Sequence, residues 1–419
     1  MNKKGNNEPA RVNVLAISYA MPPALLPQAI QIGRLLSHSS HSIGVVCGFA
    51  AGNTEADKEY EARLAFRLHV PRPPGLPRLL DKVARRAVPF FGRVPDEYRS
   101  WTEAAQKAVV DRLADGSFKP DVNISFGEPM SDHLLGRRLK RQLGVPWIAH
   151  FSDPWADNPF RRHEVLANIV NRRLEAQTVE EADLLVFTSE ETLVLFERRH
   201  GHAIRSNAAV LSHSYDPASY HAGRKPGGGK IMARYLGNFY GRRKPFPLLK
   251  ALYILRQAAD PCLENVHFEI VGDMPHWMKW HPLVRGADPS LVTIVPPVSY
   301  LRALELMTVS DLLLVIDAPA KESVFLPSKL IEYFGSDADV MGIVPPGASQ
   351  RLIAQDGGRT ADPADTAGVV KALRLALNEI KNGPRQRQAG RDAIRARYQI
   401  GPVVRAFDDI VGRVVKSLK

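Results

Sequence analysis

The chain has 419 residues, of which 45% are hydrophobic and 24% are charged, and its formal net charge is +12 at pH 7. This length and hydrophobic content suffice for two domains with separate cores, and they exclude a fibrous or wholly disordered protein. The two cysteines, Cys47 and Cys262, exclude a disulfide framework and give no zinc-type spacing. The first apolar run, residues 12–17, is too short for a signal peptide, and no segment reaches the ~20 apolar residues that cross a bilayer. We therefore expect a cytoplasmic protein, either soluble or peripheral to a membrane.

In the first half of the chain, short apolar runs alternate with segments of helical spacing. The apolar runs predict buried parallel strands at residues 12–18, 42–48, 121–126, 145–151 and 183–189. Helical spacing lies between them, at residues 24–37, 100–113, 131–143 and 161–182. This alternation is typical of a doubly wound α/β sheet, and it predicts an N-terminal domain over residues 1–216.

A basic segment between Arg63 and Arg93 interrupts this pattern. It holds eight arginines and lysines against one acid, Asp81, and they are interleaved with leucine, valine and phenylalanine. Such a mixture suits a segment that lies on an anionic membrane surface. A loop that packs its leucines into its own domain is an equally open alternative. The chain shows no motif typical of nucleic-acid binding, so we expect no nucleic-acid partner.

A Gly/Pro/basic stretch at residues 217–230 predicts a linker, after which the α/β pattern restarts. Strands are expected at residues 231–236, 267–271, 292–295, 311–317 and 340–344, and helices at residues 246–259, 300–310 and 365–380. A second doubly wound domain over residues 231–400 follows from this pattern, and a final helix at 401–419 could pack back on the first domain. Two such sheets facing across a cleft predict a ligand site at their carboxyl edges.

The segment 325–334 (FLPSKLIEYF) follows the expected strand 311–317 and begins a short helix. Pro327 suits the first turn of a helix, and the helix N-terminus offers unpaired N–H groups and partial positive charge to a phosphate. Ser328 and Glu332 are four residues apart and share one helix face. The helix could thus hold an anion and a polyol together, although an ordinary amphipathic surface helix is the alternative.

This helix resembles the donor-binding helix of retaining, family-4-like glycosyltransferases, which have the GT-B fold of two Rossmann-like domains. Glu332 matches a family glutamate that hydrogen-bonds the ribose of a nucleotide sugar. Val324 stands where many members have a second, sugar-contacting glutamate, and Glu322 could replace it. The resemblance also places Ser328 among the donor contacts.

Residues 236–245 (LGNFYGRRKP) resemble a second family element, a strand followed by a glycine and a basic turn. The resemblance implies that Gly237 lets the donor approach the backbone and that Arg243 and Lys244 neutralise its diphosphate. Asn238 stands where many members have arginine, and Lys329 could supply the missing charge. Gly272, after the expected strand 267–271, completes the implied donor site.

Residues 145–159 resemble a family strand that ends in Asp-Pro-Trp at the mouth of the cleft. By this resemblance, Asp153 would align the acceptor hydroxyl or take its proton, with His150 as the second candidate. Trp155, as a sugar-stacking ring, and Asp157 would contact the acceptor. The alternatives, that Asp153 is a turn residue and His150 a packed core residue, stay open.

The resemblance implies a glycosyltransferase that moves a sugar from a nucleoside-diphosphate sugar to a hydroxyl group with retention of configuration. Arg243 would stabilise the leaving diphosphate, and neither a metal nor a cofactor is expected. The acceptor would be a glycan or lipid-linked intermediate of cell-surface polysaccharide synthesis, at the inner face of the cytoplasmic membrane. A catalytically inactive scaffold, suggested by Val324 and Asn238, and a nucleotide-sugar epimerase are the competing interpretations.

Overall fold

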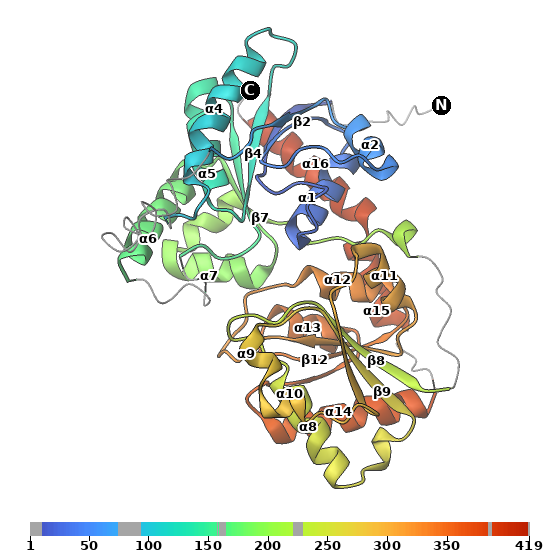
Figure 1. Ribbon diagram of the computed structural model, residues 1–419. Helices are drawn as coiled ribbons and strands as arrows, with labels where there is room; N and C mark the ends of the chain where they lie inside the picture. The colour runs from blue at the N-terminus through green and yellow to red at the C-terminus, as the bar shows by residue number, and fades with distance from the viewer. Residues whose placement is uncertain are drawn as a thin grey trace, which may run out of the picture. The chain divides into compact units, whose positions relative to one another are not determined.

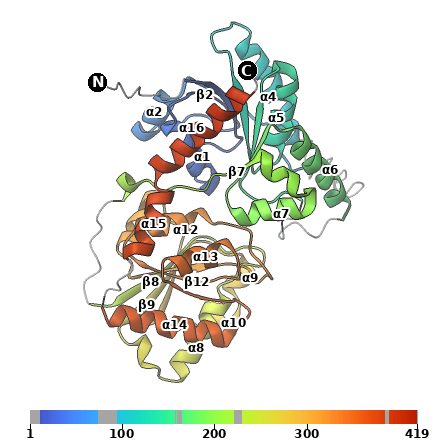
Figure 2. The ribbon, with the colours of Figure 1, turned by 180° about the vertical axis from the view of Figure 1, so that it is seen from behind.

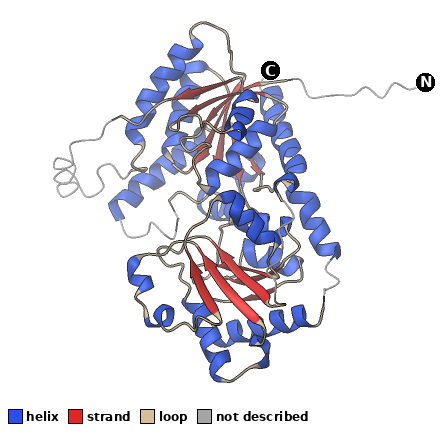
Figure 3. Cartoon of the chain, turned by 45° about the vertical axis from the view of Figure 1, so that its right-hand side comes forward, coloured by secondary structure: helices blue, strands red, loops and turns tan. Residues whose placement is uncertain are grey.

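The computed structural model describes residues 11–73, 94–156, 158, 165–220, 229–383 and 388–417. The chain divides into two compact units, one of residues 1–213 and 400–419 and the other of residues 214–399. In each unit, parallel strands form one sheet with helices packed against it (Figures 1 and 3). The predicted fold class, two doubly wound α/β sheets, is confirmed.

The first sheet has seven strands among the described residues, in the order β3-β2-β1-β4-β5-β6-β7, and every neighbouring pair is parallel. The strands are β1 (Asn13–Ile17), β2 (Ser42–Cys47), β3 (Phe66–His69), β4 (Val122–Gly127), β5 (Trp147–Phe151), β6 (Leu184–Phe187) and β7 (Ala208–Val210). The five predicted strands are all present. The apolar periodicity missed β3 and β7, which are short and form the two edges of the sheet.

The helices of the first unit bury both faces of this sheet. They are α1 (Pro27–His38), α2 (Glu55–Ala62), α4 (Arg99–Leu113), α5 (Ser131–Leu143), α6 (Val165–Glu181), α7 (Glu190–His200) and α16 (Ile400–Ser417), with a 3-10 helix at His202–Asn207. Because alternate strand residues point to opposite faces, Val14 and Ala16 pack with α1 and α16, whereas Leu15 and Ile17 pack with α4 and α5.

In the part of the chain that the structure describes, the second sheet has six strands in the order β10-β9-β8-β11-β12-β13, again all parallel. The strands are β8 (Ile231–Leu236), β9 (Val266–Val271), β10 (Val292–Val295), β11 (Leu312–Ile316), β12 (Asp339–Ile343) and β13 (Arg359–Ala361). The helices are α8 (Phe246–Gln257), α9 (His276–Lys279), α10 (Pro282–Arg285), α11 (Tyr300–Thr308), α12 (Ser328–Gly335), α13 (Ala348–Gln355), α14 (Thr366–Lys381) and α15 (Gln388–Tyr398), with 3-10 turns at Pro217–Ser219 and Pro261–Leu263. One face of the sheet packs against α8 and α14, and the other against α11, α12, α13 and α15.

The chain passes between the units at His213 and Ser214, so the division lies before the predicted boundary at residue 216. The last helix, α16, returns to the first unit and packs against α1 (Figure 2). Its Asp408 accepts hydrogen bonds from the hydroxyls of Ser39 and Ser40, at 2.6 and 2.8 Å. The C-terminal helix therefore completes the core of the N-terminal sheet. Most of the predicted linker, residues 221–228, lies outside the described residues.

Candidate functional site

The second sheet changes its winding direction between β8 and β11, and ligands of doubly wound sheets bind outside the carboxyl ends of strands at such a point. Gly237 follows β8 and Asp317 follows β11. Arg243, in the turn before α8, donates a hydrogen bond to Asp317 Oδ1 at 3.1 Å. This ion pair joins residues that are 74 positions apart, and it brings the basic turn predicted from sequence to the switch point.

Two glycines let three loops converge at this edge. Gly237 and Gly272 have φ angles of +139° and +145°, which L side chains rarely adopt. A Cβ atom on Gly237 would lie 2.3 Å from the Lys329 ammonium, and one on Gly272 would lie 2.2 Å from the carbonyl oxygen of Gly237. Both predicted donor glycines therefore occupy positions where a side chain would block close backbone approach.

Asn238, which stands where the family resemblance suggests arginine, has a structural role in this edge. Its side-chain oxygen accepts a hydrogen bond from the backbone N–H of Asp273 at 2.8 Å. Asn238 thus ties the loop after β8 to the loop after β9. The substitution removes a positive charge from the expected set, but it orders the two glycine loops.

Arg243 is buried and remains charged. Burial by itself would lower its pKa, but the carboxylate of Asp317 raises it, so the net shift is upward. The guanidinium also donates to the hydroxyl of Tyr240 at 3.1 Å, and its Nε has no hydrogen-bond partner among the described residues. Asp317 is itself held by the hydroxyl of Ser323 at 2.9 Å. Arg243 is thus a cation that Asp317 and Tyr240 hold in place.

Lys329, on the first turn of α12, is the second cation of the edge. Its ammonium donates to the hydroxyl of Tyr235 at 3.2 Å and lies 4.3 Å from the centre of that ring. Burial and the nearby charge of Arg243 lower the pKa of Lys329 to about 7, although Asp317 opposes this shift. Two basic groups therefore share one carboxylate, and an arriving anion would supply the missing negative charge. Lys244, by contrast, lies 5.3 Å from the ring of Trp277.

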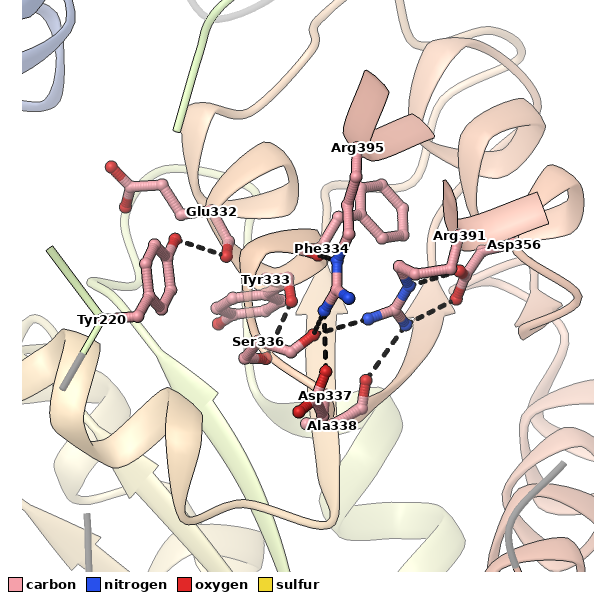
Figure 4. A network of polar contacts seen from close by, with 10 residues as sticks. All are labelled: Tyr220, Glu332, Tyr333, Phe334, Ser336, Asp337, Ala338, Asp356, Arg391 and Arg395. Atoms are coloured by element: carbon pink, nitrogen blue, oxygen red, sulfur yellow. Dashed lines mark hydrogen bonds and ion pairs between the residues drawn. The ribbon is translucent and has the colours of Figure 1, made fainter. Parts of the chain in front are cut away.

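Helix α12 presents its N-terminus with no side-chain cap, since the preceding residue is Pro327. Its C-terminal end is firmly held by two arginines of α15 (Figure 4). Arg395 donates to the carbonyl oxygens of Phe334 and Ser336, each at 2.8 Å, and Arg391 donates to that of Ser336 at 2.7 Å. Cations at a helix C-terminus satisfy its last carbonyls and its dipole. The uncapped N–H groups at the other end remain available to an anion.

Glu332 lies on the same helix and is 6% exposed. Its carboxylate accepts a hydrogen bond from the hydroxyl of Tyr300 at 2.8 Å, and its backbone carbonyl accepts one from Tyr220 at 2.7 Å. Figure 4 shows the carboxylate turned away from Arg391 and Arg395. Ser328 begins the helix and is half-buried, whereas Glu322 is exposed and Val324 is buried. Of the predicted donor residues, Ser328 and Glu332 thus lie on α12, and Glu322 and Val324 precede it.

The predicted acceptor residues lie after β5 in the first unit. Asp153 is half-buried in a turn whose next residues are fixed by α6: the N–H of Ala156 donates to Glu175 at 2.8 Å. Trp155 is 1% exposed, and its indole N–H donates to Asn171 at 3.0 Å. The expectation of an exposed ring that stacks on a sugar is therefore wrong, because the ring belongs to the core. Asp157 lies outside the described residues.

His150 is buried against Phe126, with 5.1 Å between ring centres. Burial, followed by the proximity of His213, lowers its pKa to about 3. A histidine that takes up a proton only in strong acid is a weak base at neutral pH. The structure thus favours the packed core residue over the second candidate base.

Sequence reasoning missed several residues that shape the two edges. Asp317, Tyr235 and Tyr300 were not singled out, although Asp317 is a polar residue that directly ends a buried apolar run. In the first unit, the winding changes between β1 and β4, and there Asp132 is fully buried. Its carboxyl group accepts the N–H of Tyr19 at 2.8 Å, and burial raises its pKa well above the usual range.

The expected membrane segment is only partly described. Residues 74–93 lie outside the described residues. Arg67 lies in the edge strand β3 and donates to the backbone carbonyls of Phe49 and Pro22, at 2.8 and 2.7 Å. Arg72 donates to the backbone carbonyl of Glu97 at 2.6 Å. These two arginines serve the fold of the first unit.

Residues 29–212 match the family model of the glycosyl transferase 4-like domain. No curated protein matches the chain. Among solved structures, HepE from Anabaena in complex with UDP and glucose has a TM-score of 0.68 at 12% identity, covering 96% of this chain and 100% of that chain. Sucrose-phosphate synthase from Thermosynechococcus elongatus has a TM-score of 0.71 at 13% identity, covering 97% and 100%. WaaG, a glycosyltransferase involved in lipopolysaccharide biosynthesis, has a TM-score of 0.61 at 16% identity, covering 95% and 99%. The chain therefore has the GT-B fold of these glycosyltransferase structures, and its residues 29–212 are similar to the glycosyl transferase 4-like domain.

Proposed function

We propose that this protein transfers a sugar from a nucleoside-diphosphate sugar to an acceptor hydroxyl group, with retention of configuration. The observation that carries the proposal is the edge of the second sheet, where Arg243, Lys329 and the uncapped start of α12 surround two bare glycine loops. This combination suits a diphosphate, because backbone N–H groups and cations converge where no side chain intervenes. The complex of HepE with UDP-glucose supports the same ligand class.

The catalytic step in this proposal depends on charge at the leaving group. As the glycosidic bond breaks, the bonding electrons move to the diphosphate, and fixed positive groups stabilise the charge that develops there. Arg243 is held in place by Asp317, so it need not reorganise during the reaction. We include no metal ion, because two protein cations already face this position. Asp153 remains the proposed residue for aligning the acceptor hydroxyl.

The acceptor in this proposal is a glycan or lipid-linked intermediate of cell-surface polysaccharide synthesis, met at the inner face of the cytoplasmic membrane. The proposal draws on the likeness to WaaG and on the basic composition of the chain. Among the described residues, no helix is both long enough and apolar enough to span a membrane. A catalytically inactive scaffold is the second candidate, since Val324 and Asn238 replace expected donor contacts.

Nucleotide binding tests the proposal directly. A ligand that binds only the folded protein stabilises it by about 2.7 kcal/mol at a hundred times its dissociation constant, so thermal unfolding with UDP, GDP, ADP and their sugars will identify the donor base. We expect one diphosphate to raise the melting temperature clearly above the others. If none does so, the scaffold interpretation replaces the transferase.

Glu332→Ala locates the ligand in the proposed site. A charge-assisted hydrogen bond to a ribose hydroxyl contributes ~1.5–3 kcal/mol, so we expect roughly 10- to 100-fold weaker nucleotide binding by calorimetry. Glu264→Ala, at an exposed glutamate of the same unit, serves as the control. Tyr300→Phe separates two roles of Glu332: if that variant loses as much affinity, Glu332 acts mainly by holding α11. Unchanged affinity in folded Glu332→Ala would remove this residue from the site.

A further inference from the structure

The first two turns of helix α6 are inverted relative to the ordinary amphipathic pattern of surface helices, whereas Leu174 and Val179 further along pack against the core. Its buried face carries Asn171, Glu175 and Thr178, which are polar, together with Ala167. Its exposed face begins with aliphatic residues: Val165 is 74% exposed, Leu166 is 61% and Ile169 is 58%. Surface helices normally bury apolar side chains and expose polar ones. The reversed order indicates that the outer face of α6 meets something other than water.

Helix α4 in the same unit shows the ordinary pattern. It buries Trp101, Ala105 and Val109, and it exposes Glu103 and Lys107. The exposed aliphatic residues therefore distinguish α6 from α4.

Asn171 and Glu175, on the inner face of α6, form hydrogen bonds with the turn after β5. Asn171 accepts the indole N–H of Trp155 at 3.0 Å. Glu175 accepts the N–H of Ala156 at 2.8 Å and ion pairs with Arg199 at 3.1 Å. This side of the helix therefore fixes the turn that carries Asp153. It explains why polar residues are buried, but it does not explain why aliphatic residues are exposed.

The outer face changes from aliphatic residues to two arginines along its first turns, and the exposed acid Glu180 lies near its end. Val165, Leu166, Ile169 and Val170 occupy the first two turns, and the exposed Arg172 and Arg173 follow on the next. Large exposed apolar groups that lie side by side mark an interaction site. Aliphatic side chains bordered by arginines are typical of helices that lie in the interface of an anionic bilayer. Protein hot spots, in contrast, centre on aromatic anchors, and this face has none.

We propose that the outer face of α6, defined as Val165, Leu166, Ile169, Val170, Arg172 and Arg173, inserts into the surface of an anionic lipid bilayer. The net charge of +12 favours the same partner. An α-helix with its side chains is about 10–12 Å across, so the Asp153 turn on the inner face would lie within about one helix diameter of the lipid headgroups. Resting on the proposed transferase function, this places the acceptor among membrane-held molecules whose reacting hydroxyl lies at the headgroup level.

The test compares two matched pairs of substitutions by vesicle flotation without any nucleotide. Leu166→Gln with Ile169→Gln alters the α6 face, and Ile254→Gln with Leu375→Gln alters an exposed leucine and isoleucine of the second unit. With phosphatidylcholine vesicles containing phosphatidylglycerol, we expect the α6 pair to lower partitioning roughly tenfold or more, because inserted aliphatic area contributes in proportion to its burial. The control pair should partition as the wild type does. Arg172→Gln with Arg173→Gln should weaken binding to the anionic vesicles only, and less so at high salt.

A labelled variant reports insertion of the face itself. Because Cys47 and Cys262 are buried, Ile169→Cys can be labelled with an environment-sensitive dye on an exposed thiol. We expect a blue shift with anionic vesicles at this site and none with the dye at Leu375→Cys. Equal partitioning of the α6 pair and the wild type would overturn the proposal, as would failure of the wild type to bind vesicles. If the wild type is a dimer that the α6 pair dissociates, the partner of this face is a second copy of the chain.

Nucleotide binding keeps this result separate from the transferase proposal. The α6 pair changes residues that face away from the core, so it should keep both its melting temperature and its stabilisation by the diphosphate. Membrane binding without nucleotide binding would contradict only the transferase proposal. Nucleotide binding without membrane binding would contradict only the inference on α6.

Discussion

The two units of this protein repeat one topology, but the switch point of the second unit carries positive charge whereas the buried titratable groups at the first favour their neutral forms. Between β8 and β11 in the second unit, Arg243 and Lys329 share the single carboxylate of Asp317. Between β1 and β4 in the first unit, the buried titratable groups are Asp132 and His133. Burial raises the pKa of Asp132 well above its usual range and lowers that of His133 to about 3. The shift of His133 favours its neutral form at neutral pH, and the shift of Asp132 favours its neutral form as well.

The fold determines where a site lies in each unit, whereas a few side chains determine which ligand that site suits. Parallel strands bring polar residues to the carboxyl edge in both units. The second unit adds two cations, Arg243 and Lys329, beside the uncapped N-terminus of α12, and this arrangement suits an anion. At the first switch point, Asp132 and His133 are fully buried and hydrogen-bond within the unit, to Tyr19 and Ser125.

We expect the largest effect from a substitution that removes the support of the C-terminal end of α12. Arg391 is buried, forms an ion pair with Asp356 at 2.5 Å, and donates hydrogen bonds to the carbonyl of Ser336, which caps α12, and to that of Ala338. Arg391→Met leaves the buried carboxylate of Asp356 without its partner, so we expect a loss of about 3–5 kcal/mol in the free energy of unfolding. Urea unfolding monitors this loss. Arg397→Met, at an exposed arginine of the same helix, should change stability little.

A second variant tests whether the loss of unfolding free energy comes from the unpaired carboxylate of Asp356. Arg391→Met combined with Asp356→Leu removes both ions, and we expect it to recover a large part of the stability. If the double variant is as unstable as the single one, the hydrogen bonds to the carbonyls of α12 carry the effect.

The sequence placed the residues at the carboxyl edge of the second sheet better than those of the first sheet. The reason is the distance along the chain between the residues that contact one another. Gly237 and Arg243 adjoin a recognisable strand, and Lys329 begins a recognisable helix, so local pattern suffices to place them. The orientation of Trp155 depends on Asn171 of α6, and the position of the Arg243 guanidinium depends on Asp317, which is 74 residues away. Such tertiary contacts leave no local periodicity. The same limit applies to Asn238, whose partner Asp273 lies 35 residues further along.

Arg243→Ala tests the catalytic side of the comparison and should have the next largest effect. Removing a fixed charge-stabilising donor lowers the maximal rate by about 10²–10³ in comparable sites, and we expect a smaller loss in donor affinity, because the diphosphate gains charge as it leaves. Single-turnover rates and nucleotide binding separate the two quantities. Arg242→Ala, at the exposed neighbouring residue, is the control. A loss of ground-state binding with an intact rate would contradict this role.

The smallest expected effect is the pH dependence that Lys329 gives to diphosphate affinity, and it tests the positive charge of the second switch point. Its pKa of about 7 means that the free protein holds this ammonium only partly protonated near neutral pH. A bound diphosphate favours the charged form and raises the pKa, so binding takes up a proton once the pH exceeds about 7. Affinity should therefore fall as the pH rises from 7 toward 9, by about tenfold per pH unit at most. Calorimetry in this window avoids protonation of the nucleotide itself.

The groups facing Lys329 do not obscure this dependence. Asp317 and Arg243 form an ion pair, and burial raises the pKa of Tyr235 far above the window. In the first unit, the pKa of His133 and of His150 is about 3, so these histidines do not change their protonation between pH 7 and pH 9. Lys329→Arg keeps a permanent charge and should flatten the profile, whereas Lys250→Arg at an exposed site should leave the slope as in the wild type. If the wild-type affinity is flat from pH 7 to pH 9, Lys329 does not contact the diphosphate, and the positive character of the second switch point rests on Arg243 and the helix terminus.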